Sequence, residues 1–237
     1  MSLAQLKHVD RSEIEHLVRA ALRNRSDAGA VRATMAPSSV SGGGQPNPLV
    51  VNVSARHMHV TAEHLEKLYG PGAQLTKMKD LYQEGEFASE QLVNLIGPRN
   101  RMIPGVRILG PIRKYSQVEL SYTDGVFLGI NLPLRISGEH DGTPGIVVAG
   151  PHGAVTLTQG VVRAWRHVHM NKNDLAYFGV KDGDLMRLVI EGPCGVTFDR
   201  VRVREHPRVR LEVHIDTDEG NACDLRSATR IALEKEN

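Results

Sequence analysis

Cysteine, charge excess and long apolar runs are all scarce in this chain of 237 residues. The two cysteines, Cys194 and Cys223, do not form a C-x-x-C pair, which excludes a disulfide framework and favours a reducing, cytoplasmic compartment. No apolar run approaches the roughly 18 residues of a membrane span, and the N-terminus lacks the apolar core of a secretory signal. A balance of 29 Lys and Arg against 27 Asp and Glu argues against nucleic-acid binding.

Aromatic residues make up only 4% of the chain, whereas glycine (23) and proline (12) are frequent. From Leu49 onward, short apolar runs alternate with turn signals such as Gly110-Pro111 and Asp182-Gly183. The runs cover residues 49–53, 105–109, 117–122, 145–148, 184–190, 201–204 and 209–215. This pattern predicts a mainly β chain of barrel or sandwich type, interrupted by short helices over 61–68 and 173–178.

The first 47 residues have a different pattern. Ser12 and Glu15 match a capping box at the start of a predicted amphipathic helix. Its apolar face consists of Ile14, Leu17, Val18, Ala21 and Leu22. A Gly/Ser/Pro-rich segment over 36–48 follows and is typical of a flexible linker. Because a short tethered helix cannot bury its own apolar face, we expect it to dock on its own domain, in a homo-oligomer or on a partner protein.

An internal repeat accounts for the layout. The segment Arg56-His57-Met58-His59 recurs 110 residues later as Arg166-His167-Val168-His169, and each copy leads into a short predicted helix. Residues 118–124 and 213–219 form a second related pair at a shift of 95 residues. That shift puts Glu119 opposite His214 and Arg113 opposite Arg208. The chain therefore looks like two similar β units of about 90–110 residues.

The paired histidines predict metal binding. Residues two positions apart on a strand point to the same face, so H-x-H offers two imidazoles to one ion. Surface histidines without a function have no reason to repeat at matching places. The repeat adds a third ligand to each pair and gives the sets His57, His59 and Glu119, and His167, His169 and His214. These ligand types suit zinc and also fit cobalt, nickel, manganese or iron. The sequence leaves open whether the sets form separate sites or one two-metal centre.

A basic stretch over residues 97–114 lies between the histidine pairs. Its cations are Arg99, Arg101, Arg107, Arg113 and Lys114. Guanidinium groups bind phosphate through two parallel hydrogen bonds, so the stretch predicts an anion site, with scattered solvated arginines as the alternative. Arg113 lies six residues before Glu119, an even spacing that predicts one shared strand face.

Taken together, these motifs resemble the phosphate propanoyltransferase (phosphotransacylase) family of bacterial microcompartments over about residues 49–222. The segments that carry the likeness are 53–60, 106–113, 117–119, 137–138, 142–145, 166–170, 178–180, 182–184 and 214–222. The resemblance implies a zinc-dependent acyltransferase that interconverts acyl-CoA (propanoyl-CoA or acetyl-CoA) plus phosphate with acyl phosphate plus CoA. It implies two Zn²⁺ ions on the six ligands and a catalytic, phosphate-binding role for Arg113. The CoA contacts that it implies are Val53, Ser54, Ala55, Arg99, Arg101 and Arg107.

The same resemblance implies a fold of two tandem, partly intertwined β-barrels with short capping α-helices and a tethered N-terminal amphipathic helix. The implied domains are the helix over 1–26, the linker over 27–47, one barrel from 48–56 and 165–237, and another from 57–164. In this family such a helix is an encapsulation peptide. We therefore expect it to bind microcompartment shell or core protein and to locate the enzyme inside a microcompartment in the cytoplasm.

Two other hypotheses accompany the acyltransferase. The same ligand set would serve a metal-dependent hydrolase of a thioester or phosphoester, with water as the nucleophile. A zinc-stabilised shell or scaffold module without enzymatic activity is the third. Phosphate dependence of CoA release separates the transferase from the hydrolase.

Overall fold

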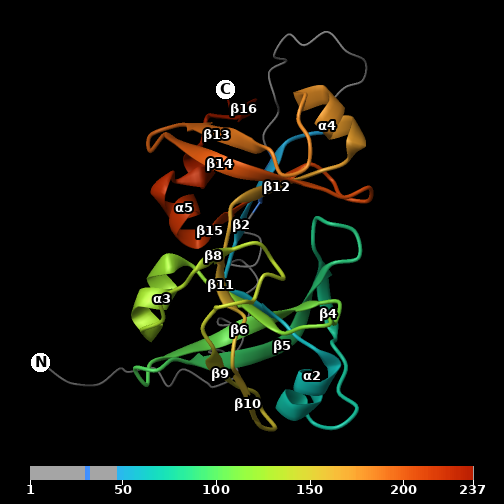
Figure 1. Ribbon diagram of the computed structural model, residues 1–237, viewed down its shortest axis with the longest axis vertical. Helices are drawn as coiled ribbons and strands as arrows, with labels where there is room; N and C mark the ends of the chain where they lie inside the picture. Colours follow the sequence, from blue (N-terminus) through green and yellow to red (C-terminus); the bar gives the residue numbers. More distant parts are fainter. Residues whose placement is uncertain (1–29, 33–46, 237) are drawn as a thin grey trace, which may run out of the picture. The chain divides into compact units, whose positions relative to one another are not determined.

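The structure is a computed structural model that describes residues 30–32 and 47–236 (Figure 1). The predicted helix over 1–26 and most of the predicted linker over 27–47 lie outside the described residues. The described residues from Val31 onward belong to one compact unit. The order of its elements follows the predicted pattern of short strands with few helices, so the mainly β prediction is confirmed.

The described chain contains short helices and many short strands. The helices are α2 (Ala62–Tyr69), α3 (Tyr122–Leu128), α4 (Lys172–Phe178) and α5 (Thr217–Ala222), with a 3₁₀ turn η1 (Leu225–Ser227). The strands are β1 (Ala30–Arg32), β2 (Val50–Ser54), β3 (His57–His59), β4 (Lys77–Asp80), β5 (Phe87–Ile96), β6 (Met102–Gly110), β7 (Gln117–Glu119), β8 (Leu134–Arg135), β9 (Ile146–Ala149), β10 (Ala154–Leu157), β11 (Val161–Ala164), β12 (His167–Met170), β13 (Leu185–Glu191), β14 (Val196–Glu205), β15 (Glu212–Asp216) and β16 (Arg230–Lys235). Among these described helices, none has the length and apolar character needed to span a membrane.

The strands form two curled sheets, each with its own apolar core. One has the order β10-β9-β5-β6-β3-β7-β11-β8, with β4 paired to β5, and the other has the order β1-β2-β15-β12-β14-β13-β16. Met58, the middle residue of the first H-x-H strand, is fully buried in the first core, and Val168 is fully buried in the second. Because side chains alternate along a strand, the histidines on either side of Met58 and Val168 point away from these cores.

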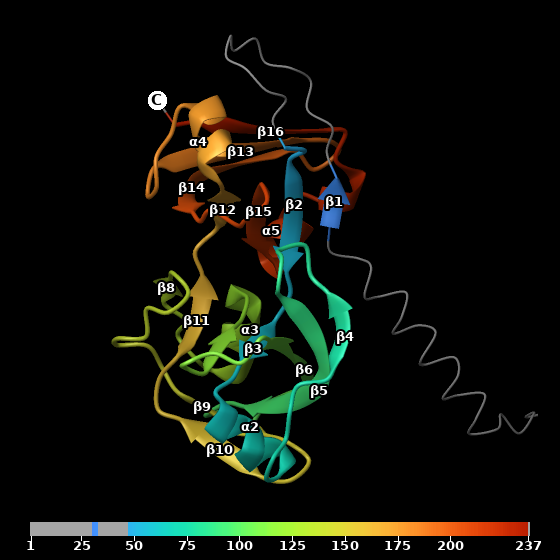
Figure 2. The same cartoon turned by 90° about the vertical axis from the view of Figure 1, so that its right-hand side faces the viewer.

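The chain crosses between the sheets twice, as Figure 2 shows for β2 with β3 and for β11 with β12. Only two residues separate the end of β2 from the start of β3, yet β2 pairs in parallel with β15 of the other sheet. Two residues likewise separate β11 from β12, yet β11 pairs in parallel with β7 of the first sheet. These crossings confirm the predicted intertwining of the two β units. The exact domain division at residues 56 and 165 stays a prediction.

The duplication includes two helices that the sequence patterns did not predict, α3 after β7 and α5 after β15. The run over 117–122 was predicted as one strand, but β7 ends at Glu119 and a helix begins at Tyr122. Each helix begins with a capping box: Ser121 with Asp124 in α3, and Asp216 with Glu219 in α5. The arginine before each H-x-H pair contacts the capping box, Arg56 with Asp124 at 3.2 Å and Arg166 with Glu219 at 3.0 Å.

Candidate metal centres

The first predicted ligand set comes together at the antiparallel pair β3·β7. Its register places His57 opposite Glu119. The donor atoms of His57, His59 and Glu119 all lie within 4.8 Å of one another. His57 Nε2 is 3.5 Å from Glu119 Oε2, and both histidines are buried. One carboxylate and two imidazoles therefore converge on one point, as a metal site requires.

The second predicted set has the same construction at the antiparallel pair β12·β15. Here the register places His167 opposite His214. The donor atoms of His167, His169 and His214 also lie within 4.8 Å of one another. The rings of His167 and His214 stack with their centroids 4.9 Å apart. Three imidazoles therefore converge where the other set has two and a carboxylate.

Hydrogen bonds leave ring nitrogens available in both sets. Nδ1 of His57 is 2.8 Å from the Ala55 carbonyl oxygen, and Nδ1 of His167 is 2.7 Å from the Trp165 carbonyl oxygen. A carbonyl only accepts, so each Nδ1–H donates and each Nε2 keeps its lone pair. Within the described part of the chain, His59 Nδ1 and His214 Nε2 are buried without a hydrogen-bond partner. Buried nitrogens without partners fit a bound cation.

Burial keeps three of these imidazoles neutral. Burial, with the neighbouring His57 imidazole, lowers the pKa of His59 to about 2. Burial, with the neighbouring His214 imidazole, lowers the pKa of His169 to about 2. Burial also lowers the pKa of His167 well below its ordinary value. Neutral imidazole is the form that ligates metal ions.

The carboxylate of Glu119 is held in its ionised form. Burial by itself raises the pKa of Glu119, but the neighbouring imidazoles of His57 and His167 and the guanidinium of Arg113 outweigh burial, so the pKa lies below its ordinary value. The Gln117 amide donates a hydrogen bond of 2.6 Å to Glu119 Oε1 and lowers the pKa further. The site therefore has a ready anionic ligand.

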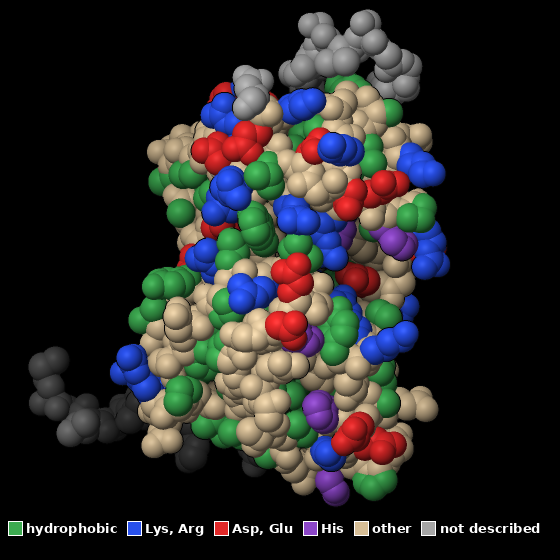
Figure 3. Space-filling model, in the orientation of Figure 1, with side chains coloured by type: hydrophobic (Ala, Val, Ile, Leu, Met, Phe, Trp, Pro, Cys, Tyr) green, Lys and Arg blue, Asp and Glu red, His purple; other side chains and the backbone are tan. Residues whose placement is uncertain are grey.

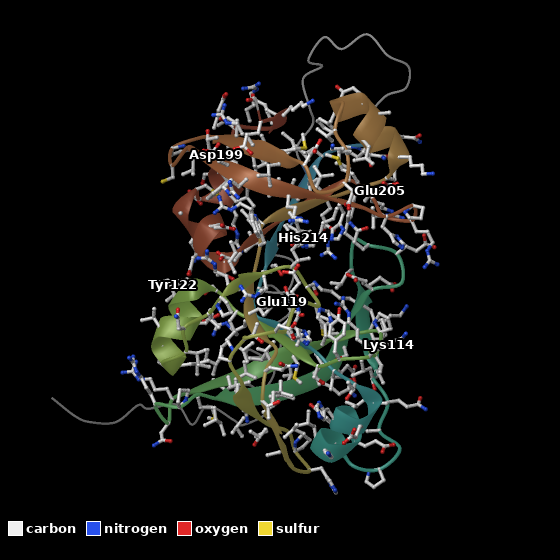
Figure 4. The ribbon with its side chains drawn as sticks, in the orientation of Figure 1. Lys114, Glu119, Tyr122, Asp199, Glu205 and His214 are labelled. Carbon is white, nitrogen blue, oxygen red and sulfur yellow. The ribbon has the colours of Figure 1, made fainter. Side chains whose placement is uncertain are left out.

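Residues of both sets line one cavity, and Figure 4 shows Glu119 and His214 at the facing sides of the two sheets. The lining residues are Ser54, Glu119, Leu120, Ala164, Trp165, His167, His214, Ile215 and Asp216. Glu119 belongs to the first set, and His167 and His214 belong to the second. The two clusters are therefore neighbours across a shared space, which the sequence had left open.

Arg113 lies in the loop between β6 and β7 and is anchored on several sides. Its main-chain N–H donates to the Val60 carbonyl oxygen (3.0 Å). Its guanidinium donates to Ser137 Oγ (3.3 Å) and lies 3.2 Å from Glu86 Oε1. The prediction that Arg113 and Glu119 share one strand is wrong, because β7 begins at Gln117. A hydrogen-bond chain connects them instead.

Gln117 is the middle of that chain. Its Nε2 donates both to Ser137 Oγ (3.0 Å), which accepts from Arg113, and to Glu119 Oε1 (2.6 Å). Its Oε1 accepts from the Gly138 main-chain N–H (2.8 Å) and from His140 Nε2 (2.9 Å). Since a main-chain N–H only donates, the Gly138 contact fixes which way the Gln117 amide points.

Comparison with known proteins shows the family to which the chain that carries these clusters belongs. Residues 50–226 match the family described as phosphate propanoyltransferase. The chain is 57% identical over 229 residues to a phosphate propanoyltransferase of Planctopirus limnophila, an alignment that covers 96% of this chain and 93% of the relative. It is 45% identical over 186 residues to that of Thermotoga maritima (78% and 88% covered) and 46% identical over 177 residues to that of Salmonella typhimurium (74% and 83% covered). The chain belongs to the phosphate propanoyltransferase family.

The two halves of this family member differ at the position of Arg113. In the first half the Arg113 N–H donates to the carbonyl of Val60, which follows the H-x-H pair. In the second half the N–H of His206 makes the equivalent bond to Met170 at 3.1 Å. The predicted equivalence of Arg113 with Arg208 is therefore wrong by two residues. The reason is that the loop after β14 reaches this bond two residues sooner than the loop after β6.

The CoA contacts that family resemblance implies at the end of β2 lie close to the clusters. Ser54 lines the shared cavity, and the Ala55 carbonyl accepts from His57 Nδ1. The side chain of Val53 packs so closely on Gly220 of α5 that a Cβ at Gly220 would come within 2.6 Å of it. Their role toward CoA stays a prediction.

The three arginines predicted to contact CoA are divided between two places. Arg99 donates to a main-chain carbonyl of α3 (3.2 Å), and Arg101 lies over the Phe127 ring of the same helix, 5.2 Å from its centroid. Arg107, on β6, donates to the Ser89 carbonyl of β5, and burial lowers its pKa. On the face of the molecule in Figure 3, basic and acidic side chains are interspersed.

Sequence reasoning missed the buried polar residues that support the ligands. Gln117 and Glu212 have exposed fractions of 0% and 1%, and each lies two positions before the third ligand of its half. The signal was available, because the shift of 95 residues that relates Glu119 to His214 also relates Gln117 to Glu212.

Proposed function

We propose that the chain is a metal-dependent phosphate acyltransferase that interconverts acyl-CoA and phosphate with acyl phosphate and CoA. Propanoyl-CoA is the first substrate to test, because propanoyl is the acyl group in the names of its relatives, and acetyl-CoA is the second. The observation that carries the proposal is the cavity lined by Glu119, His167 and His214, where both ligand clusters meet.

The residues fit a pair of divalent cations. Each cluster presents three donor atoms within 4.8 Å of one another, and burial lowers the pKa of His59, His167 and His169. His57, His59 and Glu119 would hold one ion, and His167, His169 and His214 the other, with Zn²⁺ as the first candidate. Such ions supply Lewis-acid chemistry that polarises a thioester carbonyl and stabilises charge on oxygen and sulfur.

Arg113 would bind the phosphate. Its guanidinium is already oriented by Ser137 and Glu86, so little side-chain entropy is lost when an anion binds. Held there, a phosphate oxygen attacks the thioester carbonyl carbon, a C–O bond forms, the C–S bond breaks, and CoA departs as the thiolate. Cys223 is buried and contacts the Gly220 carbonyl, and Cys194 is exposed beyond the end of β13, so the proposal uses no cysteine nucleophile.

The CoA moiety would contact residues at two places. Ser54 lines the cavity, Val53 and Ala55 flank it in the sequence, and the three would lie near the thioester end. The arginine set consists of Arg99, Arg101 and Arg107, and these would meet the phosphates of CoA.

An assay of CoA release from propanoyl-CoA tests the function. We expect release to require phosphate, to stop after chelation, and to return with Zn²⁺. Release without phosphate would favour the hydrolase. A protein that binds metal but releases no CoA under any condition would favour the scaffold.

For the N-terminal segment, which lies outside the described residues, we propose an address function. Deletion of residues 1–45 should leave turnover unchanged and abolish binding to microcompartment shell or core protein. Changing Leu17 and Leu22 together to Glu should have the same effect, because the apolar face would be lost. A truncated enzyme without turnover would contradict this proposal.

A further inference from the structure

Glu212 is a buried carboxylate that the catalytic proposal does not use. It lies on β15 with an exposed fraction of 1%. Its Oε2 accepts from Gln83 Nε2 (2.7 Å), and its Oε1 accepts from Asn52 Nδ2 (3.1 Å). Both donors are neutral amides, so they solvate the carboxylate without cancelling its charge. A buried carboxylate is costly unless a positive charge accompanies it.

The position of Glu212 beside the second cluster indicates where that charge belongs. Its Oε2 is 3.0 Å from His214 Nε2, yet His214 Nε2 has no aligned hydrogen bond within the described residues. The carboxylate therefore lies beside this ring nitrogen, at the edge of the second ligand set. An anionic side chain next to three converging imidazoles suits a bound cation.

The first half of the molecule provides the comparison. Gln117 pairs with His59 across β3·β7, and Glu212 pairs with His169 across β12·β15, so the two residues are structural equivalents. In the first half the order is neutral Gln117 and then anionic Glu119. In the second half it is anionic Glu212 and then the imidazole of His214. Each half therefore has one carboxylate in this pair of positions, displaced by two residues.

We infer that Glu212 supplies the negative charge of the second metal site, as Glu119 does for the first. This inference rests on the proposed function, because it needs a cation on the three histidines of the second set. With one divalent ion each, both sites would carry the same net charge. Glu212 is a positioning residue, since it acts beside His214 and is not one of the three converging donors.

Gln83 holds Glu212 from the other sheet. It lies in the loop between β4 and β5, and its side chain also exchanges two hydrogen bonds of 3.0 Å with the main chain of Arg210. The two hydrogen bonds with the Arg210 main chain therefore fix the orientation in which the Gln83 amide contacts Glu212. Contact from the first sheet thus sets the position of a charge in the second.

Zinc titration of the full-length, metal-free protein in competition with a chromophoric chelator tests the inference. We expect the wild type to bind two ions. Glu212→Gln should keep one site unchanged and weaken the other about 10- to 100-fold. His167→Ala identifies the weakened site, because the ion that this variant loses must be the one that Glu212→Gln weakens. Circular dichroism checks that each variant is folded.

A variant that moves the carboxylate from position 212 to position 214 tests whether Glu212 acts through its charge or only through its structural contacts. The double variant Glu212→Gln/His214→Glu recreates the Gln-x-Glu order of the first half. We expect it to bind two ions, with the second affinity restored over that of Glu212→Gln alone. If Glu212→Gln fails to fold, the double variant still decides, and binding of a single ion would overturn the inference.

Two results with Glu212→Gln would also overturn it. Unchanged affinity at both sites would mean that the carboxylate has no role toward the cation. Tighter binding at the second site would mean that Glu212 pairs with protonated His214 and competes with the metal. A wild-type protein that binds no zinc would instead contradict the proposed function itself.

Discussion

The half of the molecule built around β3 and the half built around β12 share their strand register but differ in the side chains at equivalent places. Both have an H-x-H strand opposite a third donor, and both have an arginine on a capping box. The third donor is Glu119 in one half and His214 in the other. The duplicated backbone fixes where donor atoms lie, and the side chains then decide what each half binds.

The loop after the third strand differs most between the halves. The same main-chain hydrogen bond is made by Arg113 in the first half and by His206 in the second. A guanidinium binds phosphate through two parallel hydrogen bonds, and an imidazole does not. Under the proposed function, this difference would place the phosphate in the half that contains Arg113.

Loss of a metal ligand in either half should abolish one metal site and impair acyl transfer. His57→Ala and His167→Ala each remove one of three donors, so each should lose one bound ion and reduce acyl transfer on the order of 10³-fold or more. Metal analysis of the purified variants and the CoA-release assay measure the two effects. Two retained ions in both variants would contradict the ligand sets.

Substitution at the two equivalent loop positions should separate the halves. Arg113→Ala should raise the phosphate KM about 10²-fold, since a charge-assisted double contact is lost, while metal content stays unchanged. Arg113→Lys should restore little of this loss, because lysine lacks the planar fork. His206→Ala is the matched control and should leave the phosphate KM within about twofold of wild type. Equal phosphate kinetics in both alanine variants would remove the distinction.

A smaller effect is expected from Gln117→Leu. This change removes the donor to Glu119 Oε1, so the first zinc site should weaken about tenfold while the second is unchanged. The chelator competition that tests Glu212 measures both sites. The control is Gln91→Leu, which removes an amide elsewhere. Gln91 lies on β5 and contacts Gln74 and Thr76.

The smallest effect should distinguish the two arginine–capping-box pairs. The Arg56 side chain is 45% exposed and that of Arg166 is 26% exposed. Arg166 also donates to the Asp199 carbonyl (3.1 Å) and lies over the Phe198 ring. Arg56→Ala should lower the free energy of unfolding by less than about 1 kcal/mol and Arg166→Ala by about 1–2 kcal/mol. Urea unfolding checks the order, and a larger loss for Arg56→Ala would reverse it.

The ligands could be predicted from the sequence because they obey a local rule. Alternation along a strand puts His57 with His59 and His167 with His169, and the duplication then locates Glu119 and His214. The helices α3 and α5 were missed, because the run over 117–122 has strand-like composition and α5 contains Gly220. Their capping boxes, such as Ser121 with Asp124, were the readable signal.

No comparable rule allows contacts between distant segments to be predicted from the sequence. Gln83 reaches Glu212 across 129 residues of sequence, and no periodicity relates the two. The long strand β5 was also missed, because Glu90 and Gln91 interrupt its apolar pattern. Pairing with strands on both sides, β6 and β9, stabilises β5 despite its weak local signal.

The two crossings between the sheets have a consequence for how the protein is made. Asn52 of β2 contacts Glu212 of β15, 160 residues later in the chain. During synthesis, β2 therefore leaves the ribosome long before the strand that it pairs with exists. Val50 and Val51, which are buried in the finished protein, stay uncovered through that interval. The two halves therefore cannot fold one after the other during synthesis, and the nascent chain must complete the folding of both together.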